Sequence, residues 1–174
     1  MPANNNATGL QTVKKEDKLS VDIGVEADAR AEVTRKLSAL LASTYMLYLK
    51  TLYYHWNVTG PNFPGLHQMF EQQYQELHVA GDLVAERIRA LGHFTPGTVR
   101  EFSALSSVKD DADLPKGANS MIRNLMQDNE LCSKEARSVL EAAEKLGDEV
   151  TVDMMIARMT YHDKAAWMLR DALE

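Results

Sequence analysis

The chain has 174 residues, a length that suits one domain with enough core to fold unaided. Its 25 acidic residues outnumber its 19 basic ones, and the net charge of −6 argues against a general polyanion binder and suits a cation-collecting surface. The lone Cys132 excludes an internal disulfide, and the sequence shows neither a leader-like segment nor an apolar run of membrane-spanning length. These features predict a cytoplasmic protein.

Residues 1–24 are rich in Asn, Lys, Asp and Gly and carry too little apolar periodicity to pack well, which predicts a flexible N-terminal arm. Residues 25–174 are expected to form the folded domain. In the arm, three lysines are balanced by three acids, so the segment has no net side-chain charge: Lys14, Lys15 and Lys18 against Glu16, Asp17 and Asp22.

Apolar residues recur at helical spacing through most of the domain, and glycines and prolines interrupt the pattern. The expected long helices cover residues 27–56, 66–91 and 116–146, and a last one, capped by Asp148 or Thr151, continues to the C-terminus. Residues 93–115 form a long connection in which TVREFSALS is expected to make a short helix. The fold class predicted is all-α: a ferritin-like four-helix bundle with a long crossover, containing a short helix, between helices 2 and 3.

Four potential metal ligands share one face of the second helix. At 100° per residue, His67, Glu71, Asp82 and Glu86 fall within one arc, although His67 and Glu86 lie roughly 28 Å apart along the axis. An antiparallel two-fold pairing of this helix with a second copy sets His67 opposite Glu86 and also Glu71 opposite Asp82. Together with His55, which ends the first helix, these spacings predict two identical metal sites across an isologous interface.

The residues that carry this pattern also carry a family resemblance. The stretch YYHWNVTGPNFPGLHQMFEQQYQEL, followed by GDLVAERIRALG and later by DKAAWMLR, resembles the Dps family of mini-ferritins. The resemblance implies a hollow homo-dodecameric shell that oxidises ferrous iron with hydrogen peroxide or oxygen and stores it as ferric mineral. It assigns His55, His67 and the carboxylate at position 71 to one subunit, and Asp82 and Glu86 to its two-fold mate. Position 71 is often an aspartate in the family.

Three further histidines need an interpretation. His78 departs from the usual family pattern, and its angle on the helix falls between those of Glu71 and Asp82. We therefore expect it to supplement the metal ligands and to favour zinc as a second metal at the same site; the alternative is a hydrogen bond across the interface. His162 reads as a hydrogen-bonded core histidine, and His93 as a helix-end residue near terminal carbonyls.

Two other functions compete with iron oxidation. Some Dps-like proteins coat DNA through a basic arm, but counterion release needs several unopposed cations, so DNA binding is expected to be weak or absent here. A shell that only sequesters zinc keeps the fold and lacks rapid oxidation.

No Glu-x-x-His pair occurs, so a di-iron site within a single bundle lacks its second-half signature. A cluster of acids at 148, 149 and 153 matches the position of acidic three-fold pores in Dps-like shells and equally matches a solvated helix start.

Overall fold

Residues 21–173, described by a computed structural model, form five α-helices and no strand; residues 1–20 and 174 lie outside the described part. The helices are α1 (Ala27–Asn57), α2 (Phe63–Ala90), α3 (Val99–Leu105), α4 (Ala118–Lys145) and α5 (Glu149–Asp171). Most of the predicted N-terminal arm falls outside this range, so the boundary between arm and domain stays a prediction.

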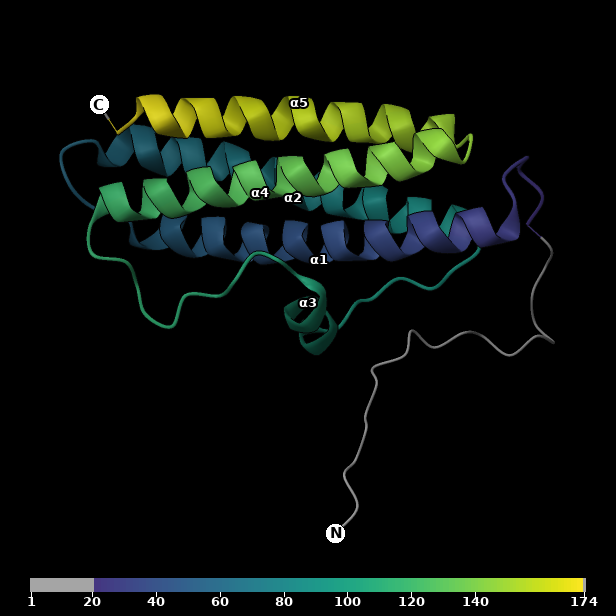
Figure 1. The fold of residues 1–174 in the computed structure, drawn as a ribbon. Coiled ribbons are helices and arrows are strands. Elements are labelled where there is room, and N and C mark those ends of the chain that lie inside the picture. The colour runs from purple at the N-terminus through teal and green to yellow at the C-terminus, as the bar shows by residue number, and fades with distance from the viewer. Residues whose placement is uncertain (1–20, 174) are drawn as a thin grey trace, which may run out of the picture.

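The four long helices make a bundle in which α1 packs against α2 and α4 against α5, and α4 also packs on α1. Figure 1 shows the crossover from α2 to α4 running along α1, with the short α3 set against its middle. This arrangement confirms the predicted all-α, ferritin-like bundle and the short helix within its crossover.

The second helix begins three residues earlier than expected. Gly60 and Pro61 stay in the connection, but Pro64 and Gly65 lie within the first turn of α2. Proline is tolerated there because the first amides of a helix have no intrahelical acceptor, so its missing N–H costs nothing. The early start matters for the site, because it places His67 in the second turn of α2 and not at the first residues of the helix.

Two clusters of buried apolar side chains fill the bundle. One surrounds the end of α1 and the start of α2, and the other surrounds the opposite ends of these helices. Their largest fully buried members include Phe70, Leu77 and Leu125 in the first cluster, and Leu37, Ile88 and Met155 in the second.

The crossover is attached to the bundle through aromatic stacking. The hydroxyl of Thr98 and the carboxylate of Glu101 form a capping box at the start of α3, so this exposed helix has its first amides satisfied. Phe102 then stacks on Tyr45 of α1, with ring centroids 4.8 Å apart. The Tyr45 ring also lies over Gly81, where an added Cβ would meet it at 3.0 Å. Gly81 therefore lets α2 approach α1 closely, beside the acids that follow it.

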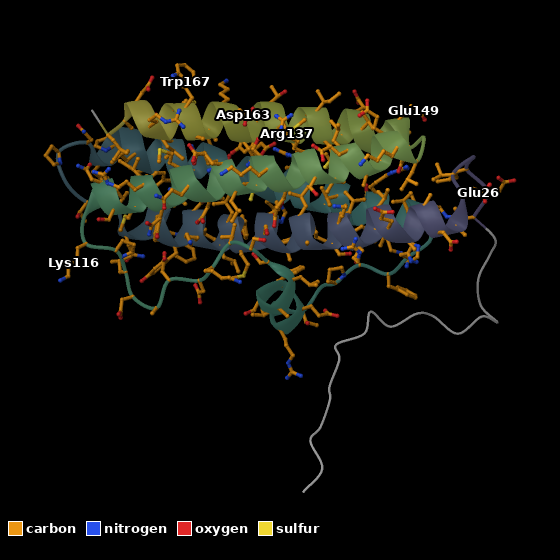
Figure 2. The ribbon with its side chains drawn as sticks, in the orientation of Figure 1. Glu26, Lys116, Arg137, Glu149, Asp163 and Trp167 are labelled. Carbon is orange, nitrogen blue, oxygen red and sulfur yellow. The ribbon has the colours of Figure 1, made fainter. Side chains whose placement is uncertain are left out.

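Large apolar side chains are exposed at several places on the bundle. Figure 2 shows Trp167 projecting outward from α5, where 54% of it is exposed. None of the helices between residues 21 and 173 combines the length and the apolar character needed to cross a membrane.

Candidate metal centre

A pair of stacked histidines lies where the turn connects α1 to α2. His55 is near the end of α1 and His67 is near the start of α2, and the five-residue turn between the helices folds the two rings onto each other. Their centroids are 3.8 Å apart and their planes are inclined by 18°. His55 is buried, whereas His67 keeps part of its surface exposed.

Each histidine is held by the backbone of the other. Nδ1 of His55 lies 2.9 Å from the carbonyl oxygen of His67, and Nδ1 of His67 lies 2.9 Å from the carbonyl oxygen of His55. A carbonyl only accepts, so each neutral ring donates through Nδ1–H and keeps the lone pair on Nε2. Metal-bound histidines commonly donate the second ring N–H to a carboxylate, a backbone carbonyl or water, and here the acceptor is a backbone carbonyl.

Two aromatic side chains flank the pair. Tyr74 meets His55 edge-on at 5.2 Å, and Phe63 lies tilted against His67 at 5.0 Å. Neither Phe63 nor Tyr74 was among the predicted site residues, because Tyr74 has the spacing of an ordinary packing residue and Phe63 precedes the predicted start of the helix. Their contacts restrict the rotation of both imidazoles.

The carboxylates divide into two groups along α2. Glu71, one turn after His67, is partly exposed and accepts a hydrogen bond from Gln75 at 3.4 Å. Asp82 and Glu86 are exposed and lie one turn apart, but they are about 22 Å and about 28 Å beyond His67 at 1.5 Å per residue. Within residues 21–173 of one chain, no three His, Cys, Asp or Glu side chains come close enough to hold a metal. One chain thus carries a histidine half and a carboxylate half of the predicted site, well separated.

The surface beside these two halves exposes large apolar side chains. On α1 they recur at three- and four-residue intervals, and on α2 they lie one turn apart: Leu49, Tyr53 and Trp56, then Val79 and Leu83. Trp56, adjacent to His55, is 67% exposed. Apolar residues concentrated on one face of two helices are typical of a surface that contacts another protein chain.

His78 lies on the exposed side of α2, and its ring packs against Tyr48 of α1 at a centroid distance of 5.6 Å. The contact holds the imidazole between the histidine half and the carboxylate half, without joining it to either within one chain. Its role as a ligand therefore stays a prediction.

The two remaining histidines behave as expected. His162 is fully buried, and its Nδ1 lies 2.9 Å from Oδ1 of Asn129 on α4. Burial, with a smaller contribution from the Arg158 charge, lowers the pKa of His162 to about 3, which keeps the ring neutral. His93 follows the end of α2, where its amide donates to the carbonyl of Ile88 at 3.2 Å.

The acidic cluster at the start of α5 differs from a solvated helix start. Asp148 is buried, and its carboxylate caps the helix by accepting the amide of Thr151 at 3.0 Å. The same carboxylate pairs with Arg87 of α2 at 2.5 Å. Asp148 therefore joins α2 to α5 and is not free to attract cations, which leaves Glu149 and Asp153 as the exposed acids.

Comparison with known proteins places this geometry in a family. A profile of the ferritin-like domain family matches residues 34–174. DNA protection during starvation protein 2 of Bacillus anthracis is 34% identical over 139 residues, which is 80% of this chain and 94% of that protein. The chain belongs to the Dps family. An uncharacterized low temperature-induced protein of Nostoc sp. is 36% identical over 155 residues, which is 88% of this chain and 87% of that protein.

Solved Dps structures agree with this assignment. Dps from Staphylococcus aureus has a TM-score of 0.79 and 37% sequence identity, and the match covers 83% of this chain and 96% of that protein. A Dps protein from Vibrio cholerae has a TM-score of 0.84 and 27% sequence identity, and the match covers 91% of this chain and 99% of that protein. Its description gives it as a member of a broad superfamily of ferritin-like diiron-carboxylate proteins. Membership of the Dps family makes this chain a mini-ferritin, a class concerned with iron storage.

Proposed function

We propose that this Dps-family protein oxidises ferrous iron at centres shared by two subunits and stores the ferric product inside a hollow shell. The reciprocally hydrogen-bonded pair His55 and His67 is the observation that carries this proposal. It fixes two Nε2 lone pairs at one end of an exposed helix face whose other end bears Asp82 and Glu86. An antiparallel second copy of α2 would bring the two ends together.

In this arrangement, His55, His67 and Glu71 of one subunit bind iron together with Asp82 and Glu86 of its mate, and His78 supplements them. Imidazole nitrogen and carboxylate oxygen suit both oxidation states of iron, and carboxylates offset the charge that iron gains on oxidation. Iron here is the substrate. Hydrogen peroxide or oxygen accepts the electrons, and each peroxide takes two, one from each of two ferrous ions. The apolar side chains around Trp56 and Leu83 would be buried in the same interface.

The assembly that follows from the two-fold pairing and from the family is a homo-dodecamer located in the cytoplasm. Zinc is a second metal for the same centres, since added histidine nitrogen favours it. Coating of DNA is a weaker candidate function, because the arm has no net charge.

A first experiment measures ferric product by its absorbance after ferrous iron is added, with oxygen and with peroxide in parallel. We expect His67→Ala combined with Glu71→Ala to slow oxidation severely while light scattering still reports a particle of twelve 19.5 kDa chains. Gln68→Ala combined with Gln72→Ala, two exposed positions on the same two turns, is the matched control and should oxidise iron normally.

A second experiment tests whether the centre is shared. The His67/Glu71 variant and an Asp82→Ala, Glu86→Ala variant are each expected to be inactive. In a mixed pair, however, one of the two sites keeps every ligand, so random co-assembly should restore about one quarter of the sites. A mixture as inactive as its components would place the centre within single chains. A stable monomer in light scattering would exclude the shell.

A further inference from the structure

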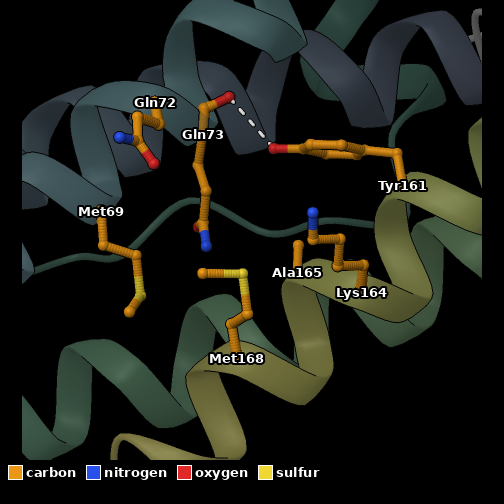
Figure 3. A pocket seen from close by; sticks show the side chains of 7 residues that line it. All are labelled: Met69, Gln72, Gln73, Tyr161, Lys164, Ala165 and Met168. Carbon is orange, nitrogen blue, oxygen red and sulfur yellow. Dashed lines mark hydrogen bonds between the residues drawn. The ribbon is translucent and has the colours of Figure 1, made fainter.

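A pocket of about 140 Å³ lies between α2 and α5. These two helices pack less closely against each other than α1 does on α2 or α4 on α5. Figure 3 shows the side chains that line the pocket, among them Met69 and Gln73 from α2, and Tyr161, Lys164, Ala165 and Met168 from α5. On α2, Met69 and Gln73 lie on a different face from His67 and Glu71.

Among the polar residues that line the pocket, Gln73 is the one that is buried. Only 6% of this residue is exposed, and neither its Oε1 nor its Nε2 has a hydrogen-bond partner among the described residues. Its backbone carbonyl is occupied, since the Tyr161 hydroxyl donates to it at 3.3 Å. In Figure 3 the carboxamide end of Gln73 is directed toward the Met168 side chain. A buried amide with both donor and acceptor unused is costly, and a ligand with the matching acceptor and donor recovers that cost.

Part of the pocket wall is apolar and adaptable. The thioethers of Met69 and Met168 and the methyl group of Ala165 line it. Thioether sulfur makes favourable contacts with aromatic rings, and an unbranched methionine adjusts to a flat ligand. An engineered protein cavity of about 150 Å³ holds benzene, so a ring of that size fits the volume found here.

The charges around the pocket decide against a metal ion. Two thioethers by themselves would suit a soft cation, but the Lys164 ammonium lines the same pocket. The other charges near the pocket offset each other, because the Arg158 guanidinium, 4.9 Å from the centre of the Tyr161 ring, pairs with the Glu76 carboxylate at 2.7 Å. A cation is therefore repelled, whereas a neutral molecule is not.

We propose that this pocket binds a small planar aromatic molecule whose carboxamide forms a two-hydrogen-bond pair with the side chain of Gln73. The ring lies against Met69 and Met168. The site is separate from the candidate metal centre, and its occupation does not depend on the proposed iron chemistry.

Benzamide is the probe, added to the assembled protein with ¹³C-labelled methionine methyl groups. We expect saturable ring-current shifts at Met69 and Met168 and none at Met155, which is buried in the other core cluster. For a molecule this small we expect a Kd in the millimolar range. Benzylamine, which has a cationic group in place of the carboxamide, should bind at least about tenfold more weakly.

Matched variants separate recognition from non-specific binding. Gln73→Leu should weaken benzamide at least about tenfold, whereas Gln68→Leu, at an exposed position on the same helix outside the pocket, should change it less than about twofold. Ala165→Leu fills the pocket and should abolish the shifts in a correctly assembled shell. Absence of saturable shifts in the native protein would overturn the proposal, as would equal binding of benzylamine or equal affinity in the Gln73 and Gln68 variants.

Discussion

The backbone around the turn between α1 and α2 sets the chemistry of two side chains. His55 and His67 each donate to the other's carbonyl, so neither ring can rotate without losing a hydrogen bond, and Nε2 stays the free nitrogen in both. A histidine pair fixed in this way needs little reorganisation when a metal ion arrives. This preorganisation is a property of the turn, because the two carbonyls belong to the two helix ends that the turn connects.

At the position of His78 the prediction concerns zinc. We expect zinc to inhibit iron oxidation at about one ion per centre, because an added imidazole makes the ligand set softer. His78→Ala should weaken that inhibition and leave the shell assembled. His93→Ala, which changes a histidine beyond the end of α2, serves as the control and should leave zinc inhibition unchanged. A zinc-soaked crystal structure with both ring nitrogens of His78 beyond roughly 3 Å from the metal would refute the assignment, since zinc to nitrogen bonds are about 2.1 Å long.

The buried His162 predicts a pH dependence of stability. Its pKa is lowered from 6.5 to about 3, so between these values the unfolded chain binds a proton that the folded chain does not. The free energy of unfolding should therefore fall as the pH falls below 6.5, by roughly 1.4 kcal/mol per pH unit from this residue, and the loss should end near pH 3. Above pH 6.5 the residue contributes no slope.

Urea unfolding of His162→Gln measures this contribution, because glutamine keeps a polar side chain near Asn129 but does not titrate. Between about pH 6.5 and about pH 5, the variant should lose about 2 kcal/mol less than the native protein. Thr160→Ala, at an exposed position on the same helix, should retain the native slope. Parallel pH profiles for native protein and His162→Gln would mean that His162 is not the titrating group.

At the scale of elements, a polar clamp holds the crossover to the bundle. Lys50 of α1 pairs with Asp128 of α4 at 2.7 Å and approaches Asp111 of the crossover at 3.8 Å. The Tyr54 hydroxyl donates to Asp111 and accepts from Asn124 at 2.9 Å. Burial, followed by the hydrogen bond to Asp111, raises the pKa of Tyr54, so the phenol stays protonated. These contacts join α1, α4 and the crossover at Tyr54, the residue directly before His55.

Removing the cation from this clamp tests its contribution. Lys50→Met leaves Asp128 largely buried without its partner, and burial already raises the pKa of that carboxyl. We expect the free energy of unfolding to fall by about 3 kcal/mol in urea titrations followed by circular dichroism. Lys36→Met on the same helix removes only an exposed hydrogen bond to Ser138 and should cost less than about 1 kcal/mol. Equal losses in the two variants would show that the clamp adds no stability.

For the whole molecule, charge predicts the response to DNA. The chain has a net charge of −6 and an arm of no net side-chain charge, so few cations are available to release counterions from DNA. A gel shift at about 0.15 M salt should show little retardation. Changing Glu16, Asp17 and Asp22 to their amides leaves three unopposed lysines on every arm, and in a multivalent shell this variant should bind in a salt-sensitive manner. Tight binding by the native protein would contradict the prediction.

The sequence by itself determined the features that depend on spacing along the chain. Helical periodicity predicted the four long helices and the short α3, and the intervals between His67, Glu71, Asp82 and Glu86 placed them on one face of α2. Both follow from a fixed rotation per residue. The start of α2 was less predictable, because Pro64 signals a turn and also suits a first helical turn.

Only the tertiary structure decided which groups meet. The exchange of hydrogen bonds between His55 and His67 depends on how the turn brings two helix ends together, and the burial of Asp148 depends on Arg87 arriving from another helix. In the same way, Gln73 is recognised as a buried, unpaired amide only once α5 lies beside α2. Periodicity orients a side chain on its own helix, whereas its hydrogen-bond partners and its desolvation are set by elements distant in sequence.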